Sequence, residues 1–258
     1  MKYILCLILL IFVYSCTETK RQAKNETVSM DSLAASIPKS DTITLINKEI
    51  KEYLEAKRLE VDINYPQLIY YPIKESMQMF NSLMKYHADN TKNLFMMEIP
   101  PLEELDDEAR ELKNEFSIDY QVINNSESLA SILYEVMQYG AGAAHGLYYN
   151  ITLNIDLHRG ELIEDYDLFA DTLFLTKVSD LTRKELLKNP ESDSAWVVSG
   201  TQPLIENFRN FNLAKDSLII TFDPYQVGPF SDGSVRVALS YKKIDATLPN
   251  RILNKNFK

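Results

Sequence analysis

Glycine, histidine and cysteine are scarce in this chain, whose 258 residues include seven, three and two of them, respectively. So few glycines cannot build many glycine-based loops. None of His87, His145 and His158 has a histidine or cysteine partner at metal-ligand spacing, and HExxH and CxxC motifs are missing. The GxSxG nucleophile elbow and the Walker A phosphate loop are missing too. The sequence therefore predicts no metal, no cofactor and no catalytic residue.

Negative charge exceeds positive charge, because the chain has 27 Lys and Arg residues but 37 Asp and Glu residues, which gives a net charge of −10. An acidic chain lacks the electrostatic footprint of a nucleic-acid-binding protein, so we expect no nucleic-acid partner. The acidic stretch 103–111 has a helical period and no glycine. It therefore indicates a solvated helix face and not a calcium loop.

The apolar run at 4–13 is only ten residues long. Crossing a bilayer core takes about 20 residues, so this run fits the hydrophobic region of a secretory signal peptide. The following Val-Tyr-Ser-Cys ends at Cys16 and resembles a bacterial lipobox, with an ordinary cleaved signal or a buried helix as alternatives. Lipidation would explain the single cysteine left after cleavage. We expect a signal peptide at 1–15, lipid attachment at Cys16, and a periplasmic or surface-facing position in the bacterial cell envelope.

A polar segment follows the expected anchor. Residues 16–41 are rich in Thr, Glu, Lys, Asn and Ser and lack periodicity, which predicts a flexible tether. The remaining chain has ordinary globular composition. We expect an N-terminal α+β part at 42–125 and a C-terminal α+β part at 126–258.

Hydrophobic periodicity predicts strands and helices in mixed order. Alternating patterns predict strands at 59–65 (closed by Pro66), 118–122, 129–139, 149–157, 217–222 and 234–241. Helical spacing predicts helices at 73–88 (reaching perhaps to Met97), at 102–116, at 172–188 behind Asp171, and a short one opened by Pro203. The fold class is therefore α+β, with mixed, mainly antiparallel strands, helices packed on them and two closely associated subdomains.

The strand at 149–157 carries a specific expectation about burial. Leu153 and Ile155 alternate with Asn154. Because strand side chains alternate between faces, we expect the two apolar residues to share the buried face. Replacing Asn154 should then cost less than replacing Leu153, unless the amide supports the nearby turns.

Three of the seven glycines lie in the segment 139–146, which separates two predicted strands. Such a segment is either a tight crossing of the chain or a loop that a ligand approaches. His145, followed by Gly146, either fixes the turn through backbone hydrogen bonds or contacts a ligand.

Loops on a rigid sheet often carry recognition, and tyrosine supplies contact area with little loss of rotamer freedom. We predict that Tyr148 and Tyr225 lie near each other at one end of the sheet, with at least one ring partly exposed beside His145. The alternative is that these rings only close the end of the core. The candidate ligand-binding residues are Gly142, His145, Gly146, Tyr148 and Tyr225.

Several segments resemble those of a bacterial exported family. They are 128–136, 142–146, 154–156, Gly160, 167–169, 216–229 and Gly233. The family is the two-part extracytoplasmic module of the lysozyme-sensing anti-sigma factor RsiV, which also precedes the catalytic domain of the peptidoglycan deacetylase PdaC. This resemblance implies an α+β fold in two intimately packed parts. In the anti-sigma factor the module binds lysozyme, and the resemblance supplies no catalytic residue.

Together these features predict a membrane-anchored envelope lipoprotein with a non-enzymatic binding module. Its expected partners are the lipid bilayer, through Cys16, and a cell-wall glycan or a wall-directed protein such as lysozyme. Two alternatives remain open, namely a wall-acting hydrolase or transferase and a scaffold for envelope assembly.

Overall fold

The computed structural model describes residues 42–101, 104–105, 110–248 and 252. The chain divides after Pro38, and Lys39–Lys258 forms a compact unit. The predicted signal peptide, Cys16 and the tether at 16–41 lie outside the described residues. Among the described residues, no helix combines the length and the apolar character needed to cross a bilayer.

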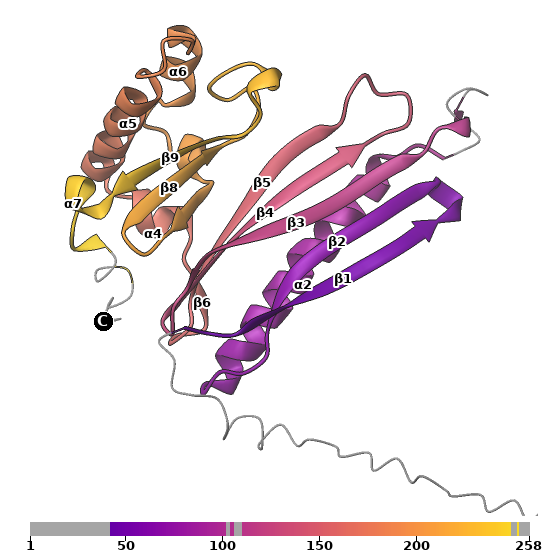
Figure 1. Cartoon of the computed structure of the whole chain (residues 1–258), viewed down its shortest axis with the longest axis horizontal. Helices are drawn as coiled ribbons and strands as arrows, with labels where there is room; N and C mark the ends of the chain where they lie inside the picture. Colours follow the sequence, from indigo (N-terminus) through magenta and orange to yellow (C-terminus); the bar gives the residue numbers. More distant parts are fainter. Residues whose placement is uncertain (1–41, 102–103, 106–109, 249–251, 253–258) are drawn as a thin grey trace, which may run out of the picture. The chain divides into compact units, whose positions relative to one another are not determined.

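Six strands in sequential order form the first sheet, and helix α2 runs along it (Figure 1). The strands are β1 (Leu45–Leu54), β2 (Leu59–Leu68), β3 (Asn114–Asn125), β4 (Leu129–Tyr139), β5 (Leu147–Asp156) and β6 (Glu161–Leu162). All neighbours pair antiparallel except β2 and β3. That parallel pair requires a crossover connection, which contains α2 (Lys74–Glu98). A one-turn helix, η1 (Glu55–Lys57), joins β1 and β2.

Helical spacing on α2 builds the first hydrophobic core. Phe80, Met84 and Ala88 are fully buried, and they face the alternating apolar residues of the sheet. Phe95, further along α2, stacks on Phe116 of β3 at 5.8 Å between ring centroids. The strands therefore present one apolar face to the helix.

Three short strands and several helices form the second sheet and core. The strands are β7 (Phe211–Leu213), β8 (Ser217–Phe222) and β9 (Val235–Ser240), and they pair antiparallel in this order. The helices are α4 (Asp165–Phe169), α5 (Thr172–Leu186), α6 (Ser194–Gly200), η3 (Ile205–Phe208), η4 (Phe230–Asp232) and α7 (Tyr241–Ile244). Asp171 begins α5 as expected, because its carboxylate accepts hydrogen bonds from two backbone amides of the first turn. Buried Phe169 packs against three other phenylalanine rings at the centre of this core.

The α+β class is confirmed, but several elements differ from expectation. Phe116 lies in β3 and not in a helix, because its side chain belongs to the alternating buried face of that strand. The rest of the predicted helix at 102–116 lies partly outside the described residues. Pro66 does not close its strand, since β2 continues to Leu68. Pairing with β3 ends at Ile63, so this stretch of β2 pairs on one side only, where proline is tolerated.

Other elements were missed or displaced. Pro203 precedes a single 3-10 turn, η3, and Phe211 belongs to β7. β1 was missed because most of its residues are polar and partly exposed at the sheet edge. The expected boundary at 125/126 falls in the turn between β3 and β4, which pair in one sheet.

Asn154 faces away from the side on which Leu153 and Ile155 pack, as expected, but its own side of β5 is buried as well. Leu153 and Ile155 do share the core face with α2. The opposite face at Asn154 is covered by β7 of the second sheet, whose backbone exchanges hydrogen bonds with the amide. The Asn154 Nδ2 donates to the Phe211 carbonyl at 2.8 Å, and its Oδ1 accepts from the Leu213 amide at 2.9 Å. This end of β5 therefore has two buried faces.

Candidate ligand-binding groove

The face of the first sheet opposite α2 carries side chains from β3, β4 and β5 in rows. The register places Asp119, Glu135 and Asn150 side by side, with Ser117, Met137 and Tyr148 in the next row. The second sheet covers the other end of this face. Between the uncovered rows and the 224–236 segment lies a cavity of about 790 Å³. We call this cavity the groove.

Five ring side chains are connected by ring contacts beside the groove, which two of them, Tyr148 and Phe230, line, and we call these five the aromatic row. They are His145, Tyr148, Phe230, Tyr225 and Trp196. The Phe230 ring lies 4.2 Å from His145, 6.0 Å from Tyr148 and 5.5 Å from Tyr225, between centroids. The Trp196 ring meets Tyr225 edge to face at 6.4 Å. Tyr148, Tyr225 and Trp196 are 49%, 56% and 38% exposed, respectively.

The predicted proximity of Tyr148 and Tyr225 is confirmed, since both rings pack on Phe230 and both are partly exposed beside His145. Neither ring is fully buried, so the two do not lie inside the core. Their role in ligand binding stays a prediction.

Local backbone conformation positions the aromatic row. The φ angle of Tyr225 is 70°, which is unusual for a residue with a side chain. Gly142 has a φ of 83° and open space around it, so its role is to allow the turn that precedes β5. At Gly146 an added Cβ would lie 3.6 Å from the Tyr148 ring, in ordinary contact. The Nδ1 of His145 lies 2.9 Å from the Gly146 carbonyl oxygen, a contact that orients the imidazole.

Polar groups line the floor of the groove. The Arg236 guanidinium donates to Glu135 at 2.6 Å and to Gln121 at 2.8 Å, and the Gln121 amide donates to Glu135 at 3.0 Å. Asp119 stands directly opposite Glu135 on the neighbouring strand. Two carboxylates in register repel each other, and of these two only Glu135 forms an ion pair with Arg236. The groove lining therefore carries a surplus of negative charge.

Asp223 joins the groove to the second sheet. Its Oδ1 accepts from the Asn150 backbone amide at 2.9 Å and side-chain amide at 2.7 Å, and its Oδ2 accepts from Asn210 at 3.1 Å. Burial raises the pKa of the Asp223 carboxyl, and these hydrogen bonds together with nearby Arg209 oppose the rise. Both carboxylate oxygens are thus occupied by structural donors.

Tyr149 is the second perturbed group near the groove. Burial is the main cause that raises its pKa to about 12, and the neighbouring charges of Glu98 and Asp223 add to the rise. The register places its side chain on the face that packs against α2. Within the described residues, no group of three or more His, Cys, Asp or Glu side chains could hold a metal ion.

Sequence reasoning missed Asp119, Glu135 and Arg236 as groove residues, and Trp196 as a member of the aromatic row. The register of β3 and β4 brings the two carboxylates together, and alternation along each strand could have placed them on the face away from the core. Trp196 lies far along the chain on a seven-residue helix, and no local pattern links it to Tyr225. Its place depends on the tertiary fold.

Comparison with known families divides the chain into two matched stretches. Residues 48–148 match the model described as deacetylase PdaC, and residues 166–242 match a protein family of unknown function, DUF3298. A curated relative, the peptidoglycan-N-acetylmuramic acid deacetylase PdaC of Bacillus subtilis (strain 168), is 25% identical over 255 residues. This chain resembles part of PdaC. The match covers 98% of this chain and 50% of the relative, so the chain spans about half the length of PdaC.

Two solved structures share the fold. A DUF3298 family member from Bacteroides fragilis is 17% identical with a TM-score of 0.54, and the match covers 84% of this chain and 98% of that one. A DUF3298 family protein from Pseudomonas aeruginosa PAO1 is 10% identical with a TM-score of 0.50, covering 80% and 95%. At these identities the likeness concerns the fold alone.

Proposed function

We propose that Lys39–Lys258 is a non-enzymatic module that binds a cell-wall glycan in the groove, and that lipid on Cys16 holds it at the bacterial cell envelope. The observation that carries this proposal is the aromatic row beside a cavity with a polar floor. A sugar ring has an apolar C–H face and a hydroxyl rim. Exposed Tyr and Trp rings pack against such faces, while carboxylates and amides accept and donate to the hydroxyls.

The charge of the groove narrows the ligand class. Asp119 and Glu135 outweigh Arg236, so an anionic ligand would be repelled. A neutral or cationic glycan meets no such repulsion. The resemblance to PdaC, whose name specifies a peptidoglycan substrate, supports the cell wall as the source of this glycan.

The geometry gives less support to a hydrolase or transferase at this site. An active site usually gathers titratable groups with perturbed pKa values that point into one cleft. Here the Asp223 oxygens are taken up by amide donors, and the Tyr149 side chain points toward α2. The two perturbed groups therefore serve the packing of the sheets.

Glycan strands from purified peptidoglycan, stripped of peptides, converted to neutral strands by amidation of the lactyl carboxylates and immobilised, test the proposal. We expect wild-type Lys39–Lys258 to be retained and Tyr148→Ala to lose at least about tenfold in affinity, a loss of about 1.4 kcal/mol. Tyr86→Ala is the matched control, because Tyr86 is exposed on α2, away from the groove. Equal retention of Tyr148→Ala and wild type would contradict the proposal.

Immobilised lysozyme forms a second arm of this experiment, because an acidic chain suits a basic protein electrostatically. Capture by lysozyme alone, with no retention on glycan, would replace the glycan proposal by a protein-binding one.

The anchor has its own test. We expect Cys16→Ala to move the full chain from the detergent phase to the aqueous phase in detergent partitioning, because the acyl chains provide the membrane affinity. A variant that stays in the detergent phase would contradict lipidation at Cys16.

A further inference from the structure

Trp196 lies at the end of the aromatic row, separated from His145 by Tyr225 and Phe230 in the series of ring contacts. Trp196 and Tyr225 together form this end of the row. Trp196 lies on α6, a helix that begins at Asp193, whose carboxylate accepts from the Ala195 and Trp196 backbone amides. Its ring meets Tyr225 edge to face while remaining partly exposed. Two exposed aromatic rings in contact gain less from burial than core rings do, so their position needs another explanation.

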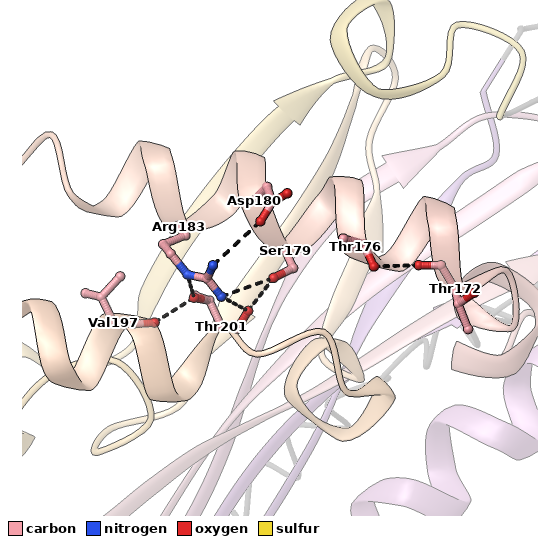
Figure 2. A network of polar contacts seen from close by, with 7 residues as sticks. All are labelled: Thr172, Thr176, Ser179, Asp180, Arg183, Val197 and Thr201. Carbon is pink, nitrogen blue, oxygen red and sulfur yellow. Dashed lines mark hydrogen bonds and ion pairs between the residues drawn. The ribbon is translucent and has the colours of Figure 1, made fainter.

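A buried polar network fixes the C-terminus of α6 on α5 (Figure 2). The Arg183 Nε donates to the Thr201 hydroxyl at 3.0 Å, and its Nη2 donates to the Thr201 carbonyl at 3.0 Å. The Ser179 hydroxyl donates to the same carbonyl. The Thr201 hydroxyl in turn donates to the Val197 carbonyl at 2.6 Å. These bonds satisfy the Thr201 carbonyl at the helix end and hold α6 in one orientation.

A close backbone contact fixes the other side of α6 on the loop that carries Tyr225. A Cβ built on Gly200 would lie 2.0 Å from the Gln226 carbonyl oxygen, which no side chain can tolerate. Tyr225 itself is held at a positive φ, a conformation that costs free energy. The helix and the loop therefore present Trp196 and Tyr225 on a rigid support, with backbone strain at Tyr225, which is 56% exposed.

We infer that Trp196 and Tyr225 form a second sugar-binding subsite, continuous with the groove through Phe230. This inference rests on the proposed function and deepens it. The ligand is then a glycan chain of several sugars, with one part in the groove beside Tyr148 and another stacked on the Trp196–Tyr225 pair. A monosaccharide or disaccharide reaches only one of the two subsites. Arg183, Thr201 and Gly200 act as positioning residues.

Trp196 is also the single tryptophan of the chain, so its fluorescence reports this subsite alone. Peptide-free peptidoglycan strands with amidated, and therefore neutral, lactyl groups, fractionated into disaccharides, tetrasaccharides and octasaccharides, serve as probes for wild-type Lys39–Lys258. We expect affinity to rise at least about tenfold from disaccharide to octasaccharide, and the tryptophan emission to change only with the longer strands.

The variant Trp196→Ala separates the two subsites. Calorimetric titration should show an octasaccharide affinity about tenfold below that of wild type and an unchanged disaccharide affinity. Leu173→Ala, at an exposed position on α5, is the matched control and should bind like wild type. Trp196 is partly exposed, so its replacement leaves both cores intact.

Two results would overturn the inference while leaving the groove proposal in place. One is an affinity that does not depend on strand length, and the other is wild-type octasaccharide affinity in Trp196→Ala. If no strand of any length binds the wild-type protein, the proposed function fails and this inference fails with it.

Discussion

The face of the first sheet opposite α2 has two ends, and these ends serve different purposes. At the closed end, Ser131 and Asn154 of the first sheet and Asn212 of the second are buried and hydrogen-bonded across the joint between the sheets. At the open end, two and three rows further along the same strands, Asp119 and Tyr148, respectively, are exposed beside a cavity. The strands and the face are the same, and what differs is whether the second sheet covers them.

This difference teaches how polarity should be interpreted on such a face. A polar side chain at the closed end is part of the packing, because a buried amide without partners costs free energy. A polar or aromatic side chain at the open end lies beside the cavity and not between the two sheets, so either a ligand or solubility explains its presence there. Variants at four places in the molecule can break or sharpen this contrast.

The largest effect is expected at the closed end. Asn154→Ala should lower the free energy of unfolding by about 3 kcal/mol, because it leaves the Leu213 amide and the Phe211 carbonyl buried without partners. Leu153→Ala should cost a comparable ~2–5 kcal/mol through its cavity. Urea denaturation measures both. Asn47→Ala, at an exposed edge position, is the control, and an Asn154→Ala effect as small as that control would remove the contrast.

The second effect concerns the support of the aromatic row. Gly200→Ala should lower the free energy of unfolding by about 1–3 kcal/mol, since the added methyl group collides with the Gln226 carbonyl. Gly140→Ala has open space around its Cβ and should change the stability by less than about 0.5 kcal/mol. Equal melting curves for the two variants would contradict the close packing of α6.

A third and smaller effect depends on pH. The pKa of Asp223 is raised in the folded state. At pH values between the ordinary aspartate pKa and the raised one, folding is therefore coupled to the uptake of a proton. The stabilising contribution of this carboxyl to the free energy of unfolding is fully present below the ordinary pKa, and it is lost as the pH rises through the raised pKa. The free energy of unfolding of wild type minus that of Asp223→Asn should therefore fall as the pH rises through this window. A difference that rises with pH would mean that hydrogen bonds, and not burial, dominate.

The smallest effect is expected at the open end. Asp119→Asn should raise the free energy of unfolding by about 0.3 kcal/mol at low salt, because it relieves the cross-strand repulsion with Glu135. The gain should vanish at high salt, where exposed charges are screened. A clear loss of stability would show that Asp119 has a structural partner.

The sequence predicts the elements whose pattern is local. The Asp171 cap, the buried stripe of α2 and the alternation of β5 all follow from neighbouring residues, and each is confirmed. The errors arise where tertiary contacts decide. Phe116 continues an apolar helical spacing but belongs to β3, and Asn154 looks solvent-facing until the second sheet covers it.

The candidate site shows the same division. Tyr148, Tyr225 and His145 were predicted to lie together because each lies in a loop or at a strand end, where recognition residues gather. Trp196 was missed, because its contact with Tyr225 depends on the packing of α6 against the 223–228 turn. The type of a secondary-structure element is encoded by neighbouring residues, whereas a contact between rings that are distant in the sequence is not.

Chemical-shift mapping tests the central claim most directly. Uniformly labelled Lys39–Lys258 is titrated with the octasaccharide strands, and the backbone amide shifts are followed residue by residue. Binding in the groove predicts shifts concentrated at Tyr148, Tyr225 and Gly233, with the amides of Asn154 and Leu213 unchanged. Shifts concentrated at the closed end, or on the far side of the first sheet along α2, would contradict it.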